Sequence, residues 1–195
     1  MKRIVTLMAA VVIMLVVSAT KTNAQQVALK TNLLYDATAT PNVGVEIGLS
    51  PRETFQVFYG LHPWKFGHGD DKKFVKHWVI NPEYRYWFCH RFNGSFVGLH
   101  AFGGEFDAAN VRAPFGYFKG LRDNRYEGWY VGAGVSYGYQ WVLARHWNFE
   151  ASVGVGVAYF DYDKFGCGVC GRKLDDGHKF YVGPTKAALS LLYMF

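Results

Sequence analysis

Two cysteines near the C-terminus have the spacing of a metal-binding or redox motif. Cys167 and Cys170 lie in the stretch CGVCG, and His178 follows them. A structural zinc site of this kind needs a second pair of cysteine or histidine ligands, and no second cysteine pair is present. Because the N-terminal sequence described below predicts export, we predict a local disulfide between Cys167 and Cys170. Free thiols and a metal site are the alternatives.

A second cluster of titratable residues lies between residues 62 and 77. It comprises His62, His68, Asp70, Asp71 and His77. Such a set is able to bind a metal or activate water, but polar clusters between strands are most often solvated loops. The glycine-rich stretch GAGVSYG lacks the spacing of a nucleotide-binding turn. We therefore predict no catalytic residue, no metal and no cofactor, and we expect a protein that is not an enzyme.

Six charged residues form a third group, because each lies on the polar side of an alternating segment. They are Lys30, Glu46, Glu83, Arg85, Glu150 and Lys186. Charges on a buried face are costly unless they pair with opposite charges or meet water. We predict one polar network inside the fold, with Arg85 at its centre because its planar guanidinium can bind two carboxylates. We predict that this network fills the interior and has a structural role, and a path for protons or ions is the alternative.

The segments that carry these charges alternate residue by residue between two kinds of side chain. In GWYVGAGVSYGYQW, residues 128–141, the odd positions are apolar or aromatic and the even positions are mostly small or polar. This alternation is typical of a β-strand whose two faces differ. Similar alternation predicts seven further strands, at residues 27–35, 41–49, 54–61, 77–89, 95–106, 147–160 and 186–195.

The connections between the predicted strands alternate in length, apart from a short link at residues 37–40. The short turns are residues 50–53, 90–94 and 142–146, and the long polar segments are residues 62–76, 107–125 and 161–185. In an up-and-down barrel, alternate connections lie at the same end, and outer-membrane barrels have short turns at one end and longer loops at the other. The sequence therefore predicts an all-β fold, an eight-stranded antiparallel up-and-down transmembrane β-barrel.

The volume of such a barrel decides which face of the strands points inward. Eight strands enclose a space only just wide enough for side chains. The large apolar residues of all eight strands cannot fit there, whereas the glycine-rich set can. The apolar face must then point outward, where lipid covers it, since a soluble protein rarely exposes so large an apolar surface. A soluble carrier like the lipocalins is the alternative fold for the same strand pattern.

Tryptophans are placed at both ends of the predicted strands. Trp78 and Trp129 begin strands at the long-loop end, and Trp141 and Trp147 flank a short turn at the other end. Two rims of amphipathic rings are typical of the two interfaces of a bilayer. Ordinary core tryptophans of a soluble sandwich are the alternative interpretation.

The last residues of the chain are similar to the terminal strand signal that the bacterial barrel-assembly machinery reads. The alternating positions of this signal are Leu189, Leu191, Tyr193 and Phe195. A terminal aromatic residue is weak evidence alone. Combined with an export signal and alternating loop lengths, it favours insertion into the bacterial outer membrane.

The first residues have the three parts of a secretory signal peptide. A basic start, MKR, precedes the apolar run 4–17 and a small-residue cleavage site that ends at Ala24. We therefore divide the chain into a signal peptide, residues 1–24, and one barrel domain, residues 25–195, with an uncleaved anchor as the alternative. Cleavage lowers the net charge from +6 to +3, because Lys2, Arg3 and Lys21 leave. No run of basic residues supports nucleic-acid binding.

Several stretches of the chain are similar to an uncharacterised family, a domain of unknown function that forms outer-membrane β-barrels and is common in Bacteroidetes. They are LKTNLLYDATATPNVGVEIGLS, NPEYRYWF, GLHAFGGEF, YEGWYVGAGVSYGYQW, VGVGVAYFDYDKFGCGVCG and GPTKAALSLLYMF. The resemblance spans nearly the whole mature chain. It implies a small barrel in the bacterial outer membrane, and some members are linked with surface fimbria systems. It implies no catalytic or ligand-binding residue.

These observations favour a non-enzymatic barrel of the cell envelope. Its long external loops would contact a surface or fimbrial protein or stabilise the membrane, and its other partners would be outer-membrane lipids and the barrel-assembly machinery. The stretch RAPFGYFKGLRDNRYEGWY, residues 112–130, combines aromatic and basic residues and is the predicted contact region. A small pore or ligand channel is one alternative, and an outer-membrane enzyme acting on lipid or peptide is another.

Overall fold

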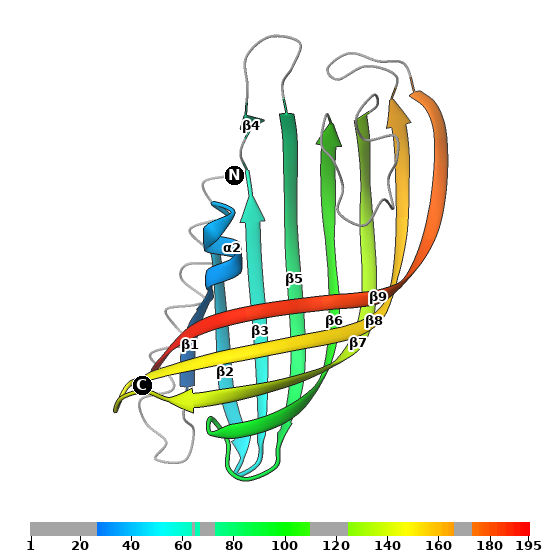
Figure 1. The fold of residues 1–195 in the computed structure, drawn as a ribbon. Helices are drawn as coiled ribbons and strands as arrows, with labels where there is room; N and C mark the ends of the chain where they lie inside the picture. Colours follow the sequence, from blue (N-terminus) through cyan, green and yellow to red (C-terminus); the bar gives the residue numbers. More distant parts are fainter. Residues whose placement is uncertain (1–26, 64, 67–72, 110–124, 166–172) are drawn as a thin grey trace.

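One ring-like antiparallel sheet accounts for nearly all of the described residues. The structure is a computed structural model and describes residues 27–63, 65–66, 73–109, 125–165 and 173–195. The elements are β1 (Val27–Asn32), α2 (Leu33–Ala37), β2 (Asn42–Ser50), β3 (Glu53–His62), β4 (Lys65–Phe66), β5 (Lys73–Trp87), β6 (Gly94–Ala109), β7 (Arg125–Val142), β8 (Trp147–Phe165) and β9 (Lys173–Met194). The sheet order is β3-β2-β1-β9-β8-β7-β6-β5-β4, and an additional β3–β5 pairing closes the ring (Figure 1).

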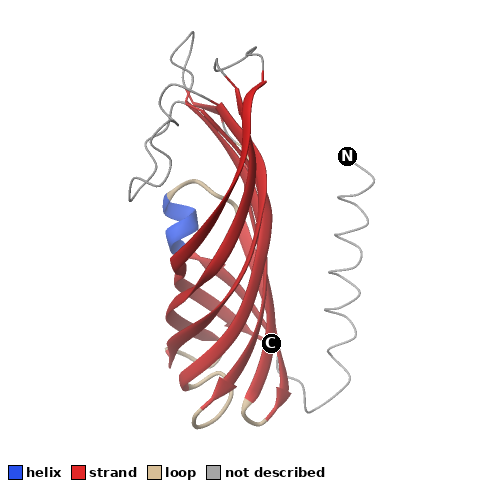
Figure 2. Cartoon of the chain, turned by 90° about the vertical axis from the view of Figure 1, so that its right-hand side faces the viewer, coloured by secondary structure: helices blue, strands red, loops and turns tan. Residues whose placement is uncertain are grey.

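The prediction of an all-β fold with eight antiparallel strands is confirmed. Consecutive long strands pair with each other, and β9 pairs with both β8 and β1. The two-residue strand β4 pairs only with the outer end of β5. The strands are strongly tilted in the side view, and tight turns connect them at the lower end (Figure 2).

The two faces of the sheet differ as the alternation predicts. On β7, Val131, Val135 and Tyr137 are exposed outside the ring, whereas Ser136 and Gln140 are buried inside it. Exposed apolar residues occur in the same way on the other long strands. The ring therefore has an apolar outer surface and a polar interior.

Glycine gives the interior space for large side chains. A Cβ atom at Gly138 would collide with the ring of Phe96 and lie 2.8 Å from the Cβ of Ser152. A Cβ atom at Gly98 would collide with the carboxylate of Glu83. These two glycines are required because the side chains of neighbouring strands occupy the space beside them.

The first strand is shorter than the predicted strand 27–35. It ends at Asn32, whose side chain accepts a hydrogen bond from the backbone N–H of Leu34 at 3.2 Å and begins helix α2. Asparagine is a favoured cap because its side chain satisfies an amide that the first helical turn leaves free. As a result Tyr35, predicted on the outer face, lines the interior.

The last two strands are longer than predicted. Residues 161–165 and 173–185, expected in a long loop, are mostly paired strand, and the β8–β9 ladder reaches Phe165 and Lys173. This outer part carries polar residues on both faces, with Asp161 and His178 on one and Lys164 and Asp175 on the other, so it has no apolar alternation to reveal it. Within the described residues, no helix is long and apolar enough to cross a membrane.

Candidate functional site

Arg85 on β5 lies inside the ring and contacts three carboxylates. Its Nη1 donates to Glu46 Oε2 at 2.9 Å and to Glu150 Oε2 at 2.8 Å. Its Nη2 donates to Glu83 Oε2 and Glu150 Oε1, both at 3.0 Å. The carboxylates come from β2, β5 and β8, so one guanidinium joins strands on different sides of the ring. The planar fork of arginine permits this many charge-assisted hydrogen bonds at once.

Two lysines complete the network. Lys30 Nζ lies 2.8 Å from Glu46 Oε2 and 3.0 Å from Glu150 Oε2. Lys186 Nζ contacts Glu83 Oε2. The structure thus brings together all six charged residues that the sequence placed on the inner face, three basic and three acidic. Because each charge has an opposite partner, the network avoids the large cost of an isolated buried ion.

Neutral side chains bind further carboxylate oxygens. Gln56 Nε2 and Ser136 Oγ both donate to Glu83, and Thr54 Oγ1 donates to Glu46 Oε1 at 2.6 Å. A network in which most acceptors are occupied holds its members in fixed positions. Gln56 was visible on the inner face of its strand in the sequence, although it was not among the predicted site residues.

Buried aromatic residues that were not among the predicted site residues lie beside the network. Trp87 Nε1 donates to Thr54 Oγ1 at 3.0 Å, and the ring of Phe96 lies 4.3 Å from the guanidinium carbon of Arg85. Both aromatic side chains are fully buried. The available signal was register, because Trp87 follows Arg85 by two residues and so shares its face.

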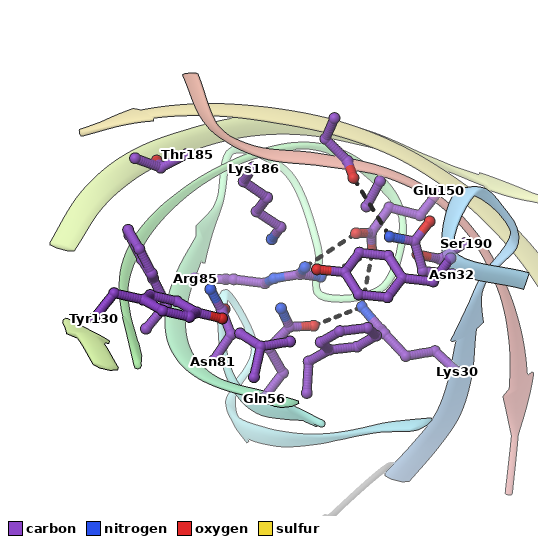
Figure 3. Close-up of a pocket in the computed structure, with 16 residues that line it drawn as sticks. Lys30, Asn32, Gln56, Asn81, Arg85, Tyr130, Glu150, Thr185, Lys186 and Ser190 are labelled. Atoms are coloured by element: carbon purple, nitrogen blue, oxygen red, sulfur yellow. Dashed lines mark hydrogen bonds and ion pairs between the residues drawn. The ribbon is translucent and has the colours of Figure 1, made fainter. Parts of the chain in front are cut away.

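A cavity of about 190 Å³ lies next to the network (Figure 3). On one side it contacts charged and amide residues of the network. On the other side it is lined by apolar and aromatic residues from five elements, namely Tyr35 of α2, Phe58 of β3, Val79 of β5, Phe102 of β6 and Tyr130 of β7. A pocket with apolar walls and a few convergent polar groups has the general form of a small-molecule site.

Asn81 on β5 lines this cavity, and its side chain is unpaired. Its Oδ1 is buried and accepts no hydrogen bond among the described residues. The residue as a whole is 8% exposed. A buried amide without partners is costly, and in native proteins it usually marks a position where water or a ligand completes the hydrogen bonds. Asn81 was on the inner face in the sequence pattern but was not predicted as a site residue.

The predicted histidine cluster is only partly within the described residues. His62 and His77 pair across β3 and β5, and their rings stack with centroids 5.4 Å apart. His62 Nδ1 is hydrogen-bonded to Thr40 Oγ1 at 2.8 Å. Burial lowers the pKa of both histidines, and the charge of His62 lowers the pKa of His77 further. Among the described residues, no group of three ligands is placed to hold a metal.

The remaining members of this cluster, His68, Asp70 and Asp71, lie outside the described residues. So do Cys167 and Cys170, for which the predicted disulfide stays a prediction, and most of the predicted contact region, residues 112–124. Cys89 is a free, exposed cysteine.

Three of the four predicted rim tryptophans are well exposed on the outer surface. They are Trp129, Trp141 and Trp147, each between 43% and 45% exposed, while Trp78 is half-buried and donates from Nε1 to Glu105. The tryptophan rings contact neighbouring aromatic residues, as in the pairs Trp129–Tyr159 and Trp147–Tyr193. They therefore belong to extended aromatic groups rather than standing alone.

The predicted C-terminal signal residues lie on β9 or directly after it. Leu189, Leu191 and Tyr193 pair with β8, and the last two also pair with β1. The backbone N–H of Phe195 donates to Val27 O at 3.0 Å. The end of the chain thus takes part in closing the ring.

A family model for a protein of unknown function (DUF3575) matches residues 10–195. The chain belongs to this family. A search of the curated proteins found no significant match. Membership spans nearly the whole chain but gives no residue a role, so the interpretation of the site depends on its geometry.

Proposed function

We propose that this DUF3575 protein is a small transmembrane β-barrel of a bacterial outer membrane, non-enzymatic and closed to ions. Its external segments would serve surface interactions, including contact with fimbrial proteins, or stabilise the membrane. The observation that carries the proposal is the orientation of the two faces, with large apolar side chains exposed and ions paired inside. This arrangement is the reverse of a soluble core and suits a surrounding lipid.

The exposed apolar residues occupy neighbouring strands and support a continuous apolar band. Outward-facing members on four consecutive strands are Tyr84 and Tyr86 on β5, Val97 and Leu99 on β6, Val131 and Val135 on β7, and Val153, Val155 and Val157 on β8. In lipid every backbone polar group needs a partner within the protein, and the antiparallel ladders of this ring supply one to most of them. The exposed tryptophans near the two ends of the strands suit the two interfaces.

The paired interior supports an anchor rather than a pore. The guanidinium of Arg85 on β5 binds Glu83 of the same strand and also Glu46 on β2 and Glu150 on β8. The fully buried side chains of Trp87 and Phe96 lie beside it. Eight strands leave little space that side chains do not fill. An ion would have to separate these charges to pass.

Planar-bilayer recording tests the closed state. We expect purified full-length protein, inserted in a bilayer, to show no stepwise conductance. Steady single-channel openings in the native protein would contradict the anchor and support the small pore. Loss of a lipid- or peptide-hydrolysing activity in His62→Gln and His77→Gln variants would instead support an outer-membrane enzyme.

Deletion of the gene tests the cellular role. We expect altered surface appendages or increased detergent sensitivity, both restored by the full-length gene. Expression in the deletion strain of a variant that lacks residues 112–124 separates the two roles. This variant should lose a surface contact but should still stabilise the membrane. If the deletion strain shows neither defect, the proposed envelope role is wrong.

A further inference from the structure

The wall of the ring is incomplete beside α2. Strand β1 pairs with β9 only from Ala28 to Asn32, opposite Met194 to Ser190, whereas β8 pairs with β9 along nearly its whole length. Beyond that point, no described strand pairs with the second edge of β9. Figure 1 shows β9 crossing the front of the ring below α2 and bending upward at the right of the view.

Asn32 marks the end of the closed seam. Its Oδ1 accepts from the backbone N–H of Leu189 at 3.2 Å, and its Nδ2 donates to Ala187 O at 3.3 Å. One side chain thus replaces the next rung of the β-ladder. The following residues form α2, which lies against β9 in place of a continued strand.

The interior cavity extends to this part of the wall. Tyr35 of α2 and residues 185–188 of β9 line it. Ala187 lines the cavity and is also exposed on the outer surface. It pairs with Val153, an outward-facing residue of the apolar band that is 65% exposed. The cavity is therefore bounded, at the level of the apolar band, by the part of β9 that lacks a strand partner on the α2 side.

We propose that this cavity binds the polar end of a hydroxylated single-chain lipid that enters sideways from the bilayer between α2 and β9. The inference rests on the proposed function, because a sideways route meets lipid only if the ring spans a membrane. The volume of about 190 Å³ equals roughly six water molecules at about 30 Å³ each, enough for a head group and the first part of a chain. The remainder of the chain would stay in the bilayer.

The chemistry of the head group follows from Asn81 and from the charge balance. The Asn81 amide offers one acceptor and one donor type, and a hydroxyl group complements both. The neighbouring charges are already paired, three basic against three acidic, so a charged head group would leave one charge unbalanced. The aromatic walls formed by Tyr35, Phe58 and Tyr130 suit the first methylenes of the chain.

The test uses a photoreactive octanol that carries a diazirine next to its hydroxyl-bearing carbon. Full-length protein in phosphatidylcholine vesicles is irradiated with this probe, and the adducts are located by mass spectrometry of peptides. We expect adducts at Tyr35 and Tyr130 in the cavity and at Val135 on the outer band. The corresponding diazirine-bearing octane should label Val135 equally and the cavity much less.

Two variants test the hydroxyl contact and the route. Asn81→Leu removes the amide without breaking any described side-chain hydrogen bond, so the protein should fold, and cavity adducts should fall roughly three- to tenfold, as for one neutral hydrogen bond. Ala187→Trp should obstruct the route and reduce cavity adducts. Ala133→Trp, at an exposed position on β7 that does not line the cavity, is the matched control and should not.

Each unfavourable outcome of these experiments overturns a different part of the proposal. Labelling of Val135 without cavity adducts means that the cavity holds water only, and the lipid site is wrong while the membrane barrel stands. Equal cavity labelling by octanol and octane, or no effect of Asn81→Leu, overturns recognition of the hydroxyl. Unchanged labelling in Ala187→Trp overturns the sideways route. Absence of adducts at both Val135 and the cavity contradicts the proposed function itself.

Discussion

At the scale of single residues, the interior depends on the mutual pairing of buried charges. Arg85 satisfies oxygens of three carboxylates, and no other residue type offers a planar fork of five donors. A buried ion pair is a weak source of stability compared with an apolar core, but removing one partner is costly, because the other charge stays buried. Removal of Arg85 would therefore destabilise the fold mainly because it leaves buried carboxylates without a partner.

Arg85→Ala should lower the stability of the folded protein by about 3–5 kcal/mol, because Glu46, Glu83 and Glu150 would lose their shared partner. The measurement is the thermal unfolding midpoint. Arg125→Ala is the matched control, since the partly exposed Arg125–Asp107 pair should contribute only about 0–1 kcal/mol. If Arg85→Ala leaves stability unchanged and opens a conductance, the network is an ion path rather than a structural filling.

The stacked pair His62 and His77 predicts acid sensitivity at the long-loop end, beyond Trp78. Burial lowers the pKa of both groups. Below the unfolded value of about 6.5, the unfolded chain binds more protons than the folded one. The stability that is present above this pH is therefore lost as the pH falls through the lowered pKa values. A His62→Gln, His77→Gln double variant should show a smaller fall in thermal midpoint on acidification, and an equal fall would place the sensitivity elsewhere.

At the scale of elements, the ring is closed by strands of very different length. The short β1 joins the long β9 by five paired residues, and Asn32 ends both β1 and the seam. The same residue caps α2. The end of this seam beside α2 thus depends on one amide side chain.

Asn32→Ala should loosen the seam locally. It removes the acceptor for the Leu34 and Leu189 amides and the donor to Ala187 O, and caps of this kind contribute about 1 kcal/mol. Hydrogen exchange should accelerate at the Leu189 amide. The amide of Val131, in the middle of β7, is the internal control and should not change. Unaltered exchange at Leu189 would show that the backbone alone holds the seam.

The sequence predicted the strands, their faces and the six charged residues of the inner face, because alternation reports directly which residues share a face. It did not predict the end of β1, since the alternation of Leu33 and Tyr35 continues past the cap that Asn32 provides. It also missed the cavity. Asn81 shares the face of Glu83 and Arg85 by alternation, but only packing shows which inner side chains are left without partners.

At the scale of the whole molecule, function depends on which surface meets which environment. The outer surface is apolar over the middle of the long strands, and the interior holds balanced charges. Both features suit a protein that spans an outer membrane without conducting ions. The external segments would then contact surface partners, and the region between α2 and β9 would admit lipid.

The most direct test of this account is labelling of the folded protein by a carbene reagent dissolved in the hydrocarbon of the bilayer. We expect adducts at Val135 and Val155, which point outward, and none at Ser136 or Ser152, their buried neighbours on β7 and β8. Adducts that avoid the valines, or that occur equally on both sets, would contradict it.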